Sequence, residues 1–252
     1  MSKVTYICLY NNQVQLDALL LPSIELLHKE GRSCGLILVD CKQRGYHSAA
    51  EAFNKTLDEN WDALADIVCF VHQDIKFDTP NFHDRLCEEL SLNPYQLLGA
   101  AGMTNKGHVL SNLRYWNTKQ YIVSHQINDK VEVESLDECC FGTSKELLSK
   151  VRFDERCCFH WHLYAVDLCY EAKRKFDYHS YVIPDMIYHK FDGDHGLTTD
   201  KHFLNTMWNL TRKYRKDYIR LYAPCYIIST HPLMAVYKLL RSTLSNILKC
   251  KK

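Results

Sequence analysis

The sequence lacks the short patterns that identify several common enzyme classes. It has 12 cysteines among 252 residues, yet no two of them have the Cys-x-x-Cys spacing of zinc fingers. It contains neither the HExxH pattern of zinc proteases nor the nucleophile elbow of α/β-hydrolases. No GxGxxG follows the first expected strand, which argues against a dinucleotide-dependent oxidoreductase. The many histidine, aspartate and cysteine residues still leave a metal-dependent hydrolase open as an alternative.

The chain also lacks a strong charge of either sign and any long apolar segment. Its formal net charge is +1 at pH 7, whereas proteins that bind nucleic acid usually have a strongly basic face. The N-terminus lacks the features of a signal peptide, and no apolar run reaches the roughly 18 residues of a membrane span. We therefore expect a cytoplasmic protein without a nucleic-acid partner, whose cysteines remain reduced.

The first half of the chain alternates between strand and helix patterns. Short apolar runs predict buried strands at residues 4–10, 35–39, 67–71 and 97–101. Apolar residues at helical spacing predict helices at residues 19–29, 48–57 and 81–90. Buried strands separated by helices are typical of a parallel sheet covered on both faces. We therefore predict an α/β fold with a mostly parallel central sheet flanked by helices.

The second half is less regular. A hairpin around Asn128-Asp129 is predicted from its flanking segments, 121–125 and 131–134. An interrupted strand, a helix and two short strands are expected next, at residues 136–142, 162–176, 181–184 and 186–189. The pattern is helical from about residue 200. This divides the chain into a main domain, residues 1–199, and a helical C-terminal extension, residues 200–252.

Polar residues stand where three of the expected strands end, namely at Asn11-Asn12, Asp40 and His72-Gln73-Asp74. Ligands of open α/β sheets bind beyond the carboxyl ends of the strands, so these positions are candidates for a binding site. Asp74 is the strongest candidate, because a carboxylate is a suitable ligand for Mg²⁺ or Mn²⁺. A cap of the following turn would explain Asp74 equally well.

Residues 67–75 (IVCFVHQDI) resemble the strand and motif of one branch of the family 2-like glycosyltransferases with the GT-A fold. In that branch His-Gln-Asp takes the place of Asp-x-Asp. Further matching pieces follow in the expected order over about residues 4–196: Tyr10-Asn11-Asn12, Val39-Asp40, 49–54 (AAEAFN), 133–137 (VESLD), Phe153-Asp154-Glu155, 162–169 (HLYAVDLC), Val182-Ile183-Pro184, and His189 with Gly193. The resemblance implies transfer of a sugar from a nucleoside-diphosphate sugar to a glycan or lipid-linked acceptor, in cell-surface polysaccharide synthesis.

The resemblance also implies how the donor is bound. The first two strand ends of GT-A enzymes hold the nucleotide base and ribose, which assigns Tyr10, Asn11 and Asn12 to the nucleoside pocket. Asp40 is then the expected acceptor for a base N–H, and Asn54 would face the ribose or the diphosphate. Ordinary turn, loop-cap and helix-end chemistry remains the alternative for these residues.

A divalent cation, Mn²⁺ or Mg²⁺, is implied as well, because it would stabilise the leaving diphosphate. Asp74 and His189 are the expected ligands, although His189 alternatively caps a strand end. His72 replaces the first carboxylate of Asp-x-Asp, so we expect His72 and Gln73 to contact the ribose or a phosphate. Asp74 would then hold the metal without a second carboxylate. This replacement keeps a non-catalytic nucleotide- or glycan-binding module open as the alternative function.

An inverting transferase needs a general base that accepts the proton of the acceptor hydroxyl. Asp137, at the end of a strand on the expected acceptor side, is the first candidate. Asp167 is the second, and a buried structural hydrogen bond is its alternative; Glu155 ranks lower. His162 is a further candidate, because histidine titrates near neutral pH. A retaining transferase would need no such base.

We also predict roles for two further segments. Residues 191–196 (FDGDHG), which include His195, are suited to closing over the donor. Residues 233–252 are amphipathic and basic, and they either pack on the domain or lie peripherally on the inner membrane surface near lipid-linked acceptors. The sequence identifies neither the sugar, the nucleotide and the acceptor nor the oligomeric state.

Overall fold

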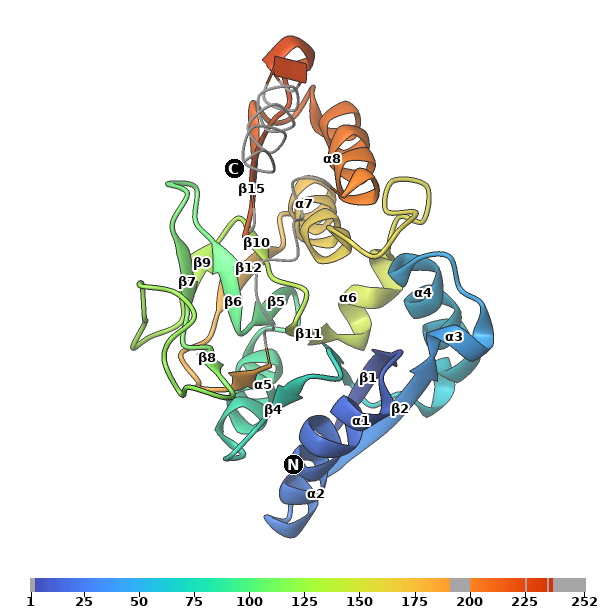
Figure 1. Cartoon of the computed structure of the whole chain (residues 1–252), viewed down its shortest axis with the longest axis vertical. Helices are drawn as coiled ribbons and strands as arrows, with labels where there is room; N and C mark the ends of the chain where they lie inside the picture. The colour runs from blue at the N-terminus through green and yellow to red at the C-terminus, as the bar shows by residue number, and fades with distance from the viewer. Residues whose placement is uncertain (1–2, 191–199, 225, 235, 238–252) are drawn as a thin grey trace, which may run out of the picture.

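A seven-stranded sheet with helices on both faces forms the centre of the molecule (Figure 1). The computed structural model describes residues 3–190, 200–224, 226–234 and 236–237. The strands are β1 Val4–Tyr10, β2 Cys34–Asp40, β3 Ile67–Val71, β4 Ile75–Lys76, β5 Gln96–Gly99, β6 Ala101–Met103, β7 Val109–Ser111, β8 Arg114–Tyr115, β9 Val131–Val133, β10 Ser135–Leu136, β11 Cys140–Ser144, β12 His179–Val182, β13 Tyr188–His189, β14 Arg220–Ala223 and β15 Tyr226–Ser229. The helices are α1 Gln13–Gln15, the π-helix η1 Leu16–Leu20, α2 Leu21–Lys29, α3 Cys41–Arg44, α4 Ala49–Asn60, the 3₁₀-helix η2 Trp61–Ala63, α5 Asn81–Leu92, α6 Lys145–Lys150, α7 Tyr164–Phe176 and α8 Lys201–Tyr214.

The large sheet has the strand order β2-β1-β3-β11-β5-β12-β9. Strands β2, β1 and β3 run parallel, as the apolar runs predicted. Strand β11 then lies antiparallel between β3 and β5, and β9 lies antiparallel beside β12. The α/β fold is confirmed, and its sheet is more mixed than expected, because strands from the second half of the chain are inserted into it and added at its edge.

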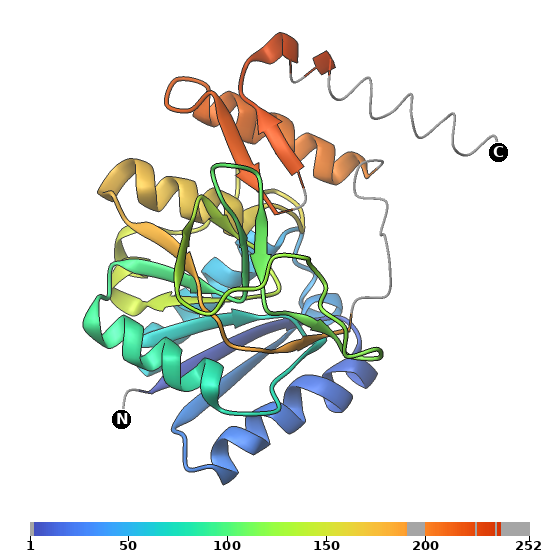
Figure 2. The same ribbon diagram turned by 90° about the vertical axis from the view of Figure 1, so that its left-hand side faces the viewer.

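Side chains of β1 alternate between two hydrophobic clusters, which explains why both faces of the sheet are covered. Tyr6 and Cys8 pack in the cluster that holds η1, α2 and α5. Ile7 packs in the cluster that holds α4, α6, α7 and α8. Figure 2 shows these two helical layers on opposite sides of the sheet. The carboxyl ends of β1, β2 and β3 are thereby held by packing from both sides.

Helix α4 begins where its sequence predicts. The Ser48 hydroxyl accepts the Glu51 N–H, and the Glu51 carboxylate accepts the N–H of His47, the residue before the cap. Such a cap contributes about 1 kcal/mol. It fixes the first turn of α4, from which Ala49 and Phe53 face the sheet.

A small sheet, β4-β13-β8, brings distant segments together. Strand β13 pairs with β4 in antiparallel register, with His189 opposite Ile75. It also pairs with β8 in parallel register. Because Ile75 directly follows Asp74, this pairing carries His189 to the end of β3, more than a hundred positions away in sequence.

Two expectations about the second half are wrong. The hairpin around Asn128-Asp129 does not form, since β9 pairs with β12 and residues 121–125 make only isolated bridges among the described residues. The chain is not helical throughout from residue 200, because β14 and β15 form an antiparallel hairpin after α8. Leu221, Ala223 and Ile228 are buried with strand periodicity there, and this burial outweighs the helical pattern.

The described part of the extension shares the core of the main domain. Phe203, Met207 and Leu210 of α8 lie in the same cluster as α7. The division at residues 199 and 200 stays a prediction, and the segment expected to close over the donor, residues 191–196 with His195, lies outside the described residues. Most of the amphipathic tail, from residue 238 onward, also lies outside them. In the part of the chain that is described, no helix is both long enough and apolar enough to cross a membrane.

Candidate functional site

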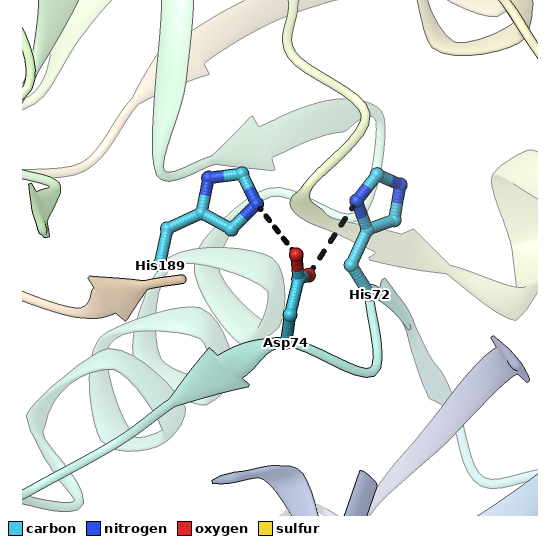
Figure 3. A group of neighbouring side chains, drawn as sticks. All are labelled: His72, Asp74 and His189. Carbon is cyan, nitrogen blue, oxygen red and sulfur yellow. Dashed lines mark ion pairs between the residues drawn. The ribbon is translucent and has the colours of Figure 1, made fainter. Parts of the chain in front are cut away.

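Three side chains converge just beyond the carboxyl end of β3. His72 Nδ1 lies 4.0 Å from Asp74 Oδ1, and His189 Nε2 lies 3.3 Å from Asp74 Oδ2. One nitrogen or oxygen from each residue falls within 4.8 Å of the others. Figure 3 shows the two imidazole rings on either side of the carboxylate. We call His72, Asp74 and His189 the His-Asp-His cluster.

Backbone hydrogen bonds hold this cluster in place. His72 N–H donates to the Cys139 carbonyl at 2.9 Å, which anchors the end of β3 to the segment before β11. Lys190 N–H donates to the Asp74 carbonyl at 3.0 Å, and Trp116 N–H donates to the His189 carbonyl at 3.1 Å. The three side chains are therefore positioned by the fold before any ligand binds.

The electrostatics of the cluster suit a cation. Asp74 Oδ1 is buried and has no hydrogen-bond partner within the described part of the chain. Burial raises the pKa of the Asp74 carboxyl, but the hydrogen bond and charge of His189, with the charge of His72, bring it below its usual value. Burial also lowers the pKa of His72, and the neighbouring Asp74 only partly opposes this. A charged carboxylate and a neutral imidazole are the forms that bind metal ions.

The donor set indicates which cation fits. Imidazole nitrogens favour transition metals, whereas Mg²⁺ prefers oxygen ligands and water. Two imidazoles and one carboxylate therefore fit Mn²⁺ better than Mg²⁺. The family resemblance gave Asp74 only His189 as a fellow ligand and assigned His72 to the ribose or a phosphate. In the structure the Nδ1 atom of His72 faces Asp74, so His72 is a candidate third ligand.

A cavity of about 390 Å³ opens beside the cluster. It is lined by the ends of β1 and β3, the start of α3, one face of α4 and two aromatic residues from the segment around the start of α7. The lining residues are Leu9, Tyr10, Asn11, Cys41, Lys42, Ala49, Phe53, Val71, His72, Gln73, Asp74, Trp161 and Tyr164. The volume and the concave form are typical of a small-molecule site.

Gln73 joins the two strand ends that border the cavity. Its Oε1 accepts the N–H groups of Asn11 and Asn12, both at 2.9 Å. Its Nε2 donates to Asn11 Oδ1 at 3.0 Å. Asn12 also caps α1 by accepting the Gln15 N–H. The structure thus brings Gln73, Asn11 and Asn12 together, and of these three Asn11 and Gln73 line the cavity.

Of the other residues expected to bind the donor, Tyr10 lines the cavity, whereas Asp40 and Asn54 are bonded to other parts of the protein. Tyr10 lines the cavity, and its hydroxyl bonds Asp40; burial and this neighbour raise the pKa of Tyr10. Asp40 Oδ1 also accepts the Lys42 and Gln43 N–H groups, so this residue serves as a loop cap. Asn54 does not reach the cavity lining, because its side chain is bonded to Phe153 and Glu155.

The candidates for a general base have different surroundings. Asp137 is near enough to His72 for its charge to act on the imidazole, and its Oδ1 accepts the Cys139 N–H. Asp167 is 1% exposed and bonded to Lys213 and Tyr214, which is the structural alternative stated for it. His162 Nε2 lies 3.1 Å from Asp200 at the start of α8. Of these three residues, only Asp137 lies beside the His-Asp-His cluster.

Sequence reasoning assigned no role to several residues that the structure places here. Tyr164 lines the cavity, and its hydroxyl bonds His72 Nε2 at 3.2 Å. Glu138 accepts the Tyr164 N–H at 2.9 Å. Burial, with the charge of Asp137, raises the pKa of Glu138 well above its usual value. The adjacent carboxylates Asp137-Glu138 were a visible signal in the sequence, whereas Lys42 and Trp161 had none.

A second group with metal-ligand atoms consists of Cys157, Cys158 and Asp167. The Lys213 ammonium already lies 2.8 and 3.0 Å from the two Asp167 oxygens. This half-buried ammonium occupies the position that a cation would take. The His-Asp-His cluster is therefore the better metal site among the described residues.

Comparisons with known proteins bear on the fold. No family model matches the chain, and no curated protein matches it by sequence. Among solved structures, GalNAc-T7 in complex with UDP, GalNAc and Mn²⁺ aligns with a TM-score of 0.57 at 6% identity, over 85% of this chain and 48% of that one. The protein A197 from STIV aligns with a TM-score of 0.44 at 15% identity, over 76% of this chain and 87% of that one. The chain thus spans about half the length of the GalNAc-T7 chain.

The likeness to GalNAc-T7 shows a GT-A-like glycosyltransferase fold.

Proposed function

We propose that the protein is a metal-dependent glycosyltransferase that moves a sugar from a nucleoside-diphosphate sugar to a hydroxyl of a glycan or lipid-linked acceptor. The observation that carries the proposal is the buried Asp74 Oδ1, which has no hydrogen-bond partner among the described residues. It lies between two imidazoles, at the edge of a cavity of about 390 Å³. A GT-A-like fold with such a site at the carboxyl ends of its strands supports this function, and cell-surface polysaccharide synthesis is the proposed setting.

His72, Asp74 and His189 would hold the cation, with Mn²⁺ favoured by the donor set. When bound, the cation neutralises charge on the diphosphate as that group leaves. Tyr10, Asn11 and Gln73 would contact the nucleoside, because they line the cavity next to the cluster. Lys42, which lines the same cavity, adds a positive charge where the donor is anionic.

In the proposed reaction the acceptor oxygen attacks the anomeric carbon of the sugar. A carbon–oxygen bond to the acceptor forms, and the bond to the diphosphate breaks. Asp137 takes the acceptor proton, because its charge acts on His72 and it forms no ion pair with a basic side chain among the described residues. A single displacement of this kind inverts the configuration of the sugar.

A thermal-shift screen tests the donor class. We expect one family of nucleoside diphosphates to stabilise the protein in the presence of Mn²⁺, and less so without it. A ligand at 100 times its dissociation constant adds about 2.7 kcal/mol. For a domain of this size that raises Tm by about 5–10 °C. No stabilisation by UDP, GDP, CDP or dTDP and their sugars would count against the proposal, while binding without slow release of diphosphate from the sugar donor would favour a binding module.

The extension is proposed to bring the enzyme to the inner membrane surface. Leu233, Val236 and Tyr237 are exposed, and lysines and an arginine follow in the sequence. Each basic residue near an anionic surface contributes about 1 kcal/mol, so deletion of residues 233–252 should weaken binding to anionic vesicles at least about tenfold. Co-sedimentation measures this. Equal binding of the full and shortened chains would remove the membrane role and leave the site untouched.

A further inference from the structure

Tyr164 links the start of α7 to the His-Asp-His cluster. Its hydroxyl lies 3.2 Å from His72 Nε2. The other ring nitrogen of His72, Nδ1, faces Asp74. The Tyr164 ring packs against Phe53, Phe141 and Phe153, with centroid distances of 5.5, 6.4 and 6.0 Å. A ring enclosed in this way has little freedom to move its hydroxyl away from His72.

Glu138 fixes the backbone from which Tyr164 projects. Helix α7 starts after Leu163, a residue with φ of 65° whose side chain makes no capping hydrogen bond. The first N–H groups of a helix need acceptors, and a carboxylate near them is favoured by the helix dipole. The Glu138 carboxylate supplies this acceptor to Tyr164 N–H at 2.9 Å. Glu138, from the segment before β11, therefore caps α7 in place of a residue next to the helix.

The hydrogen bond to Tyr164 determines which ring nitrogen of His72 is free to bind a metal. An imidazole that binds a metal through Nδ1 carries its proton on Nε2 and donates it to a fixed partner. The Tyr164 oxygen lies where that partner is needed. At 4.0 Å, the separation of His72 Nδ1 and Asp74 Oδ1 is too long for a hydrogen bond, so the two atoms are free to share a cation (Figure 3).

We propose that Tyr164, held by Glu138, is the positioning residue that turns His72 Nδ1 toward the metal. This inference rests on the proposed metal-dependent function and assigns to Tyr164 and Glu138 a role outside direct contact with the ion. Loss of such a hydrogen bond typically weakens metal affinity 10- to 100-fold. The effect is expected on metal binding itself, before any donor is added.

The test compares Mn²⁺ affinity of purified variants by the EPR signal of free Mn²⁺. Tyr164→Phe keeps the ring and removes the hydroxyl, and we expect its Mn²⁺ affinity to fall about 10- to 100-fold. Tyr170→Phe is the matched control, because Tyr170 is a buried tyrosine of the same helix whose hydroxyl accepts the Tyr222 N–H. Its Mn²⁺ affinity should equal that of the wild type, whatever stability it loses.

A second pair of variants tests the part played by Glu138. Glu138→Gln retains an acceptor for the Tyr164 N–H and should bind Mn²⁺ nearly as the wild type does. Glu138→Ala removes the acceptor and should weaken Mn²⁺ binding at least about tenfold. Far-ultraviolet circular dichroism establishes that each variant is folded.

The outcomes separate this inference from the proposed function. Equal Mn²⁺ affinity of wild type and Tyr164→Phe would overturn the positioning role and leave the metal centre standing. An equal loss in Tyr170→Phe would also overturn it, since the effect would then be one of general packing. A wild-type protein that binds no Mn²⁺ would overturn both the inference and the metal-dependent function.

Discussion

Asp74→Asn is expected to reduce release of nucleoside diphosphate from the sugar donor at least about 1000-fold in the presence of Mn²⁺. Asparagine preserves the shape of the side chain but removes the negative charge between His72 and His189. A cation that stabilises a leaving diphosphate contributes several kcal/mol, and about 4 kcal/mol corresponds to a factor of about a thousand in rate. The measurement is donor hydrolysis, with the nucleotide sugar that gives the largest thermal shift.

Asp78→Asn is the matched control for this substitution. Asp78 lies four residues further on, beyond β4, and pairs with Lys76 at 3.6 Å. Its removal should change the rate less than about fivefold, because an exposed ion pair contributes about 1 kcal/mol or less. Equal rates for Asp74→Asn and wild type would mean that the cluster is not the reaction centre.

Lys213→Met is expected to lower the free energy of unfolding by about 3–5 kcal/mol, without touching the cavity. Lys213 Nζ lies 2.8 and 3.0 Å from the two oxygens of buried Asp167 and 2.9 Å from Asp154. Its loss leaves a buried carboxylate without a counter-charge. The corresponding fall in Tm is about 10 °C, which scanning calorimetry would register.

The stability lost in Lys213→Met should depend on pH, and it should be larger at high pH. Burial raises the pKa of Asp167 to about 6 even beside Lys213, while the unfolded value is about 3.9. A carboxyl whose pKa is raised by folding favours the folded state in its protonated form, so its contribution to stability falls as pH rises from about 4 to 6. In Lys213→Met the pKa of Asp167 should rise further. The loss in free energy of unfolding should therefore be smaller at pH 5 than at pH 8.

Two further variants sharpen this test. Lys216→Met alters an exposed lysine three residues away and should change stability by less than about 0.5 kcal/mol. The double variant Asp167→Asn with Lys213→Met removes both charges and should be more stable than Lys213→Met alone. A loss in Lys213→Met that is the same at both pH values and is not relieved in the double variant would contradict a buried ion pair.

The sequence predicted those parts of the molecule whose structure depends on local pattern. The bounds of β1 and β3 match their apolar runs, because a strand buried on both faces needs apolar side chains at every position. The position of Asp74 at a strand end followed from the same pattern. The fold class was predicted correctly as well, since buried strands and helices alternate through the first half of the chain.

The remaining parts depend on pairings between distant segments. His189 was expected as a ligand only through the family resemblance. It reaches Asp74 because β13 pairs with β4, and the sequence contains no local signal for that register. Asp167 looked like a candidate base until α8 supplied Lys213 and Tyr214 as its partners. The Tyr164 hydroxyl meets His72 only once α7 has packed on the sheet. Side-chain roles that arise from tertiary packing could therefore not be read from spacing.

Crystals of the wild-type protein grown with Mn²⁺ and the most stabilising nucleoside diphosphate test the central claim most directly. Diffraction data collected at the manganese absorption edge should give one anomalous peak bounded by His72 Nδ1, an Asp74 oxygen and His189 Nε2, with the diphosphate next to it. A peak bound by other residues, or nucleotide density in the cavity with no peak at the cluster, would contradict the account.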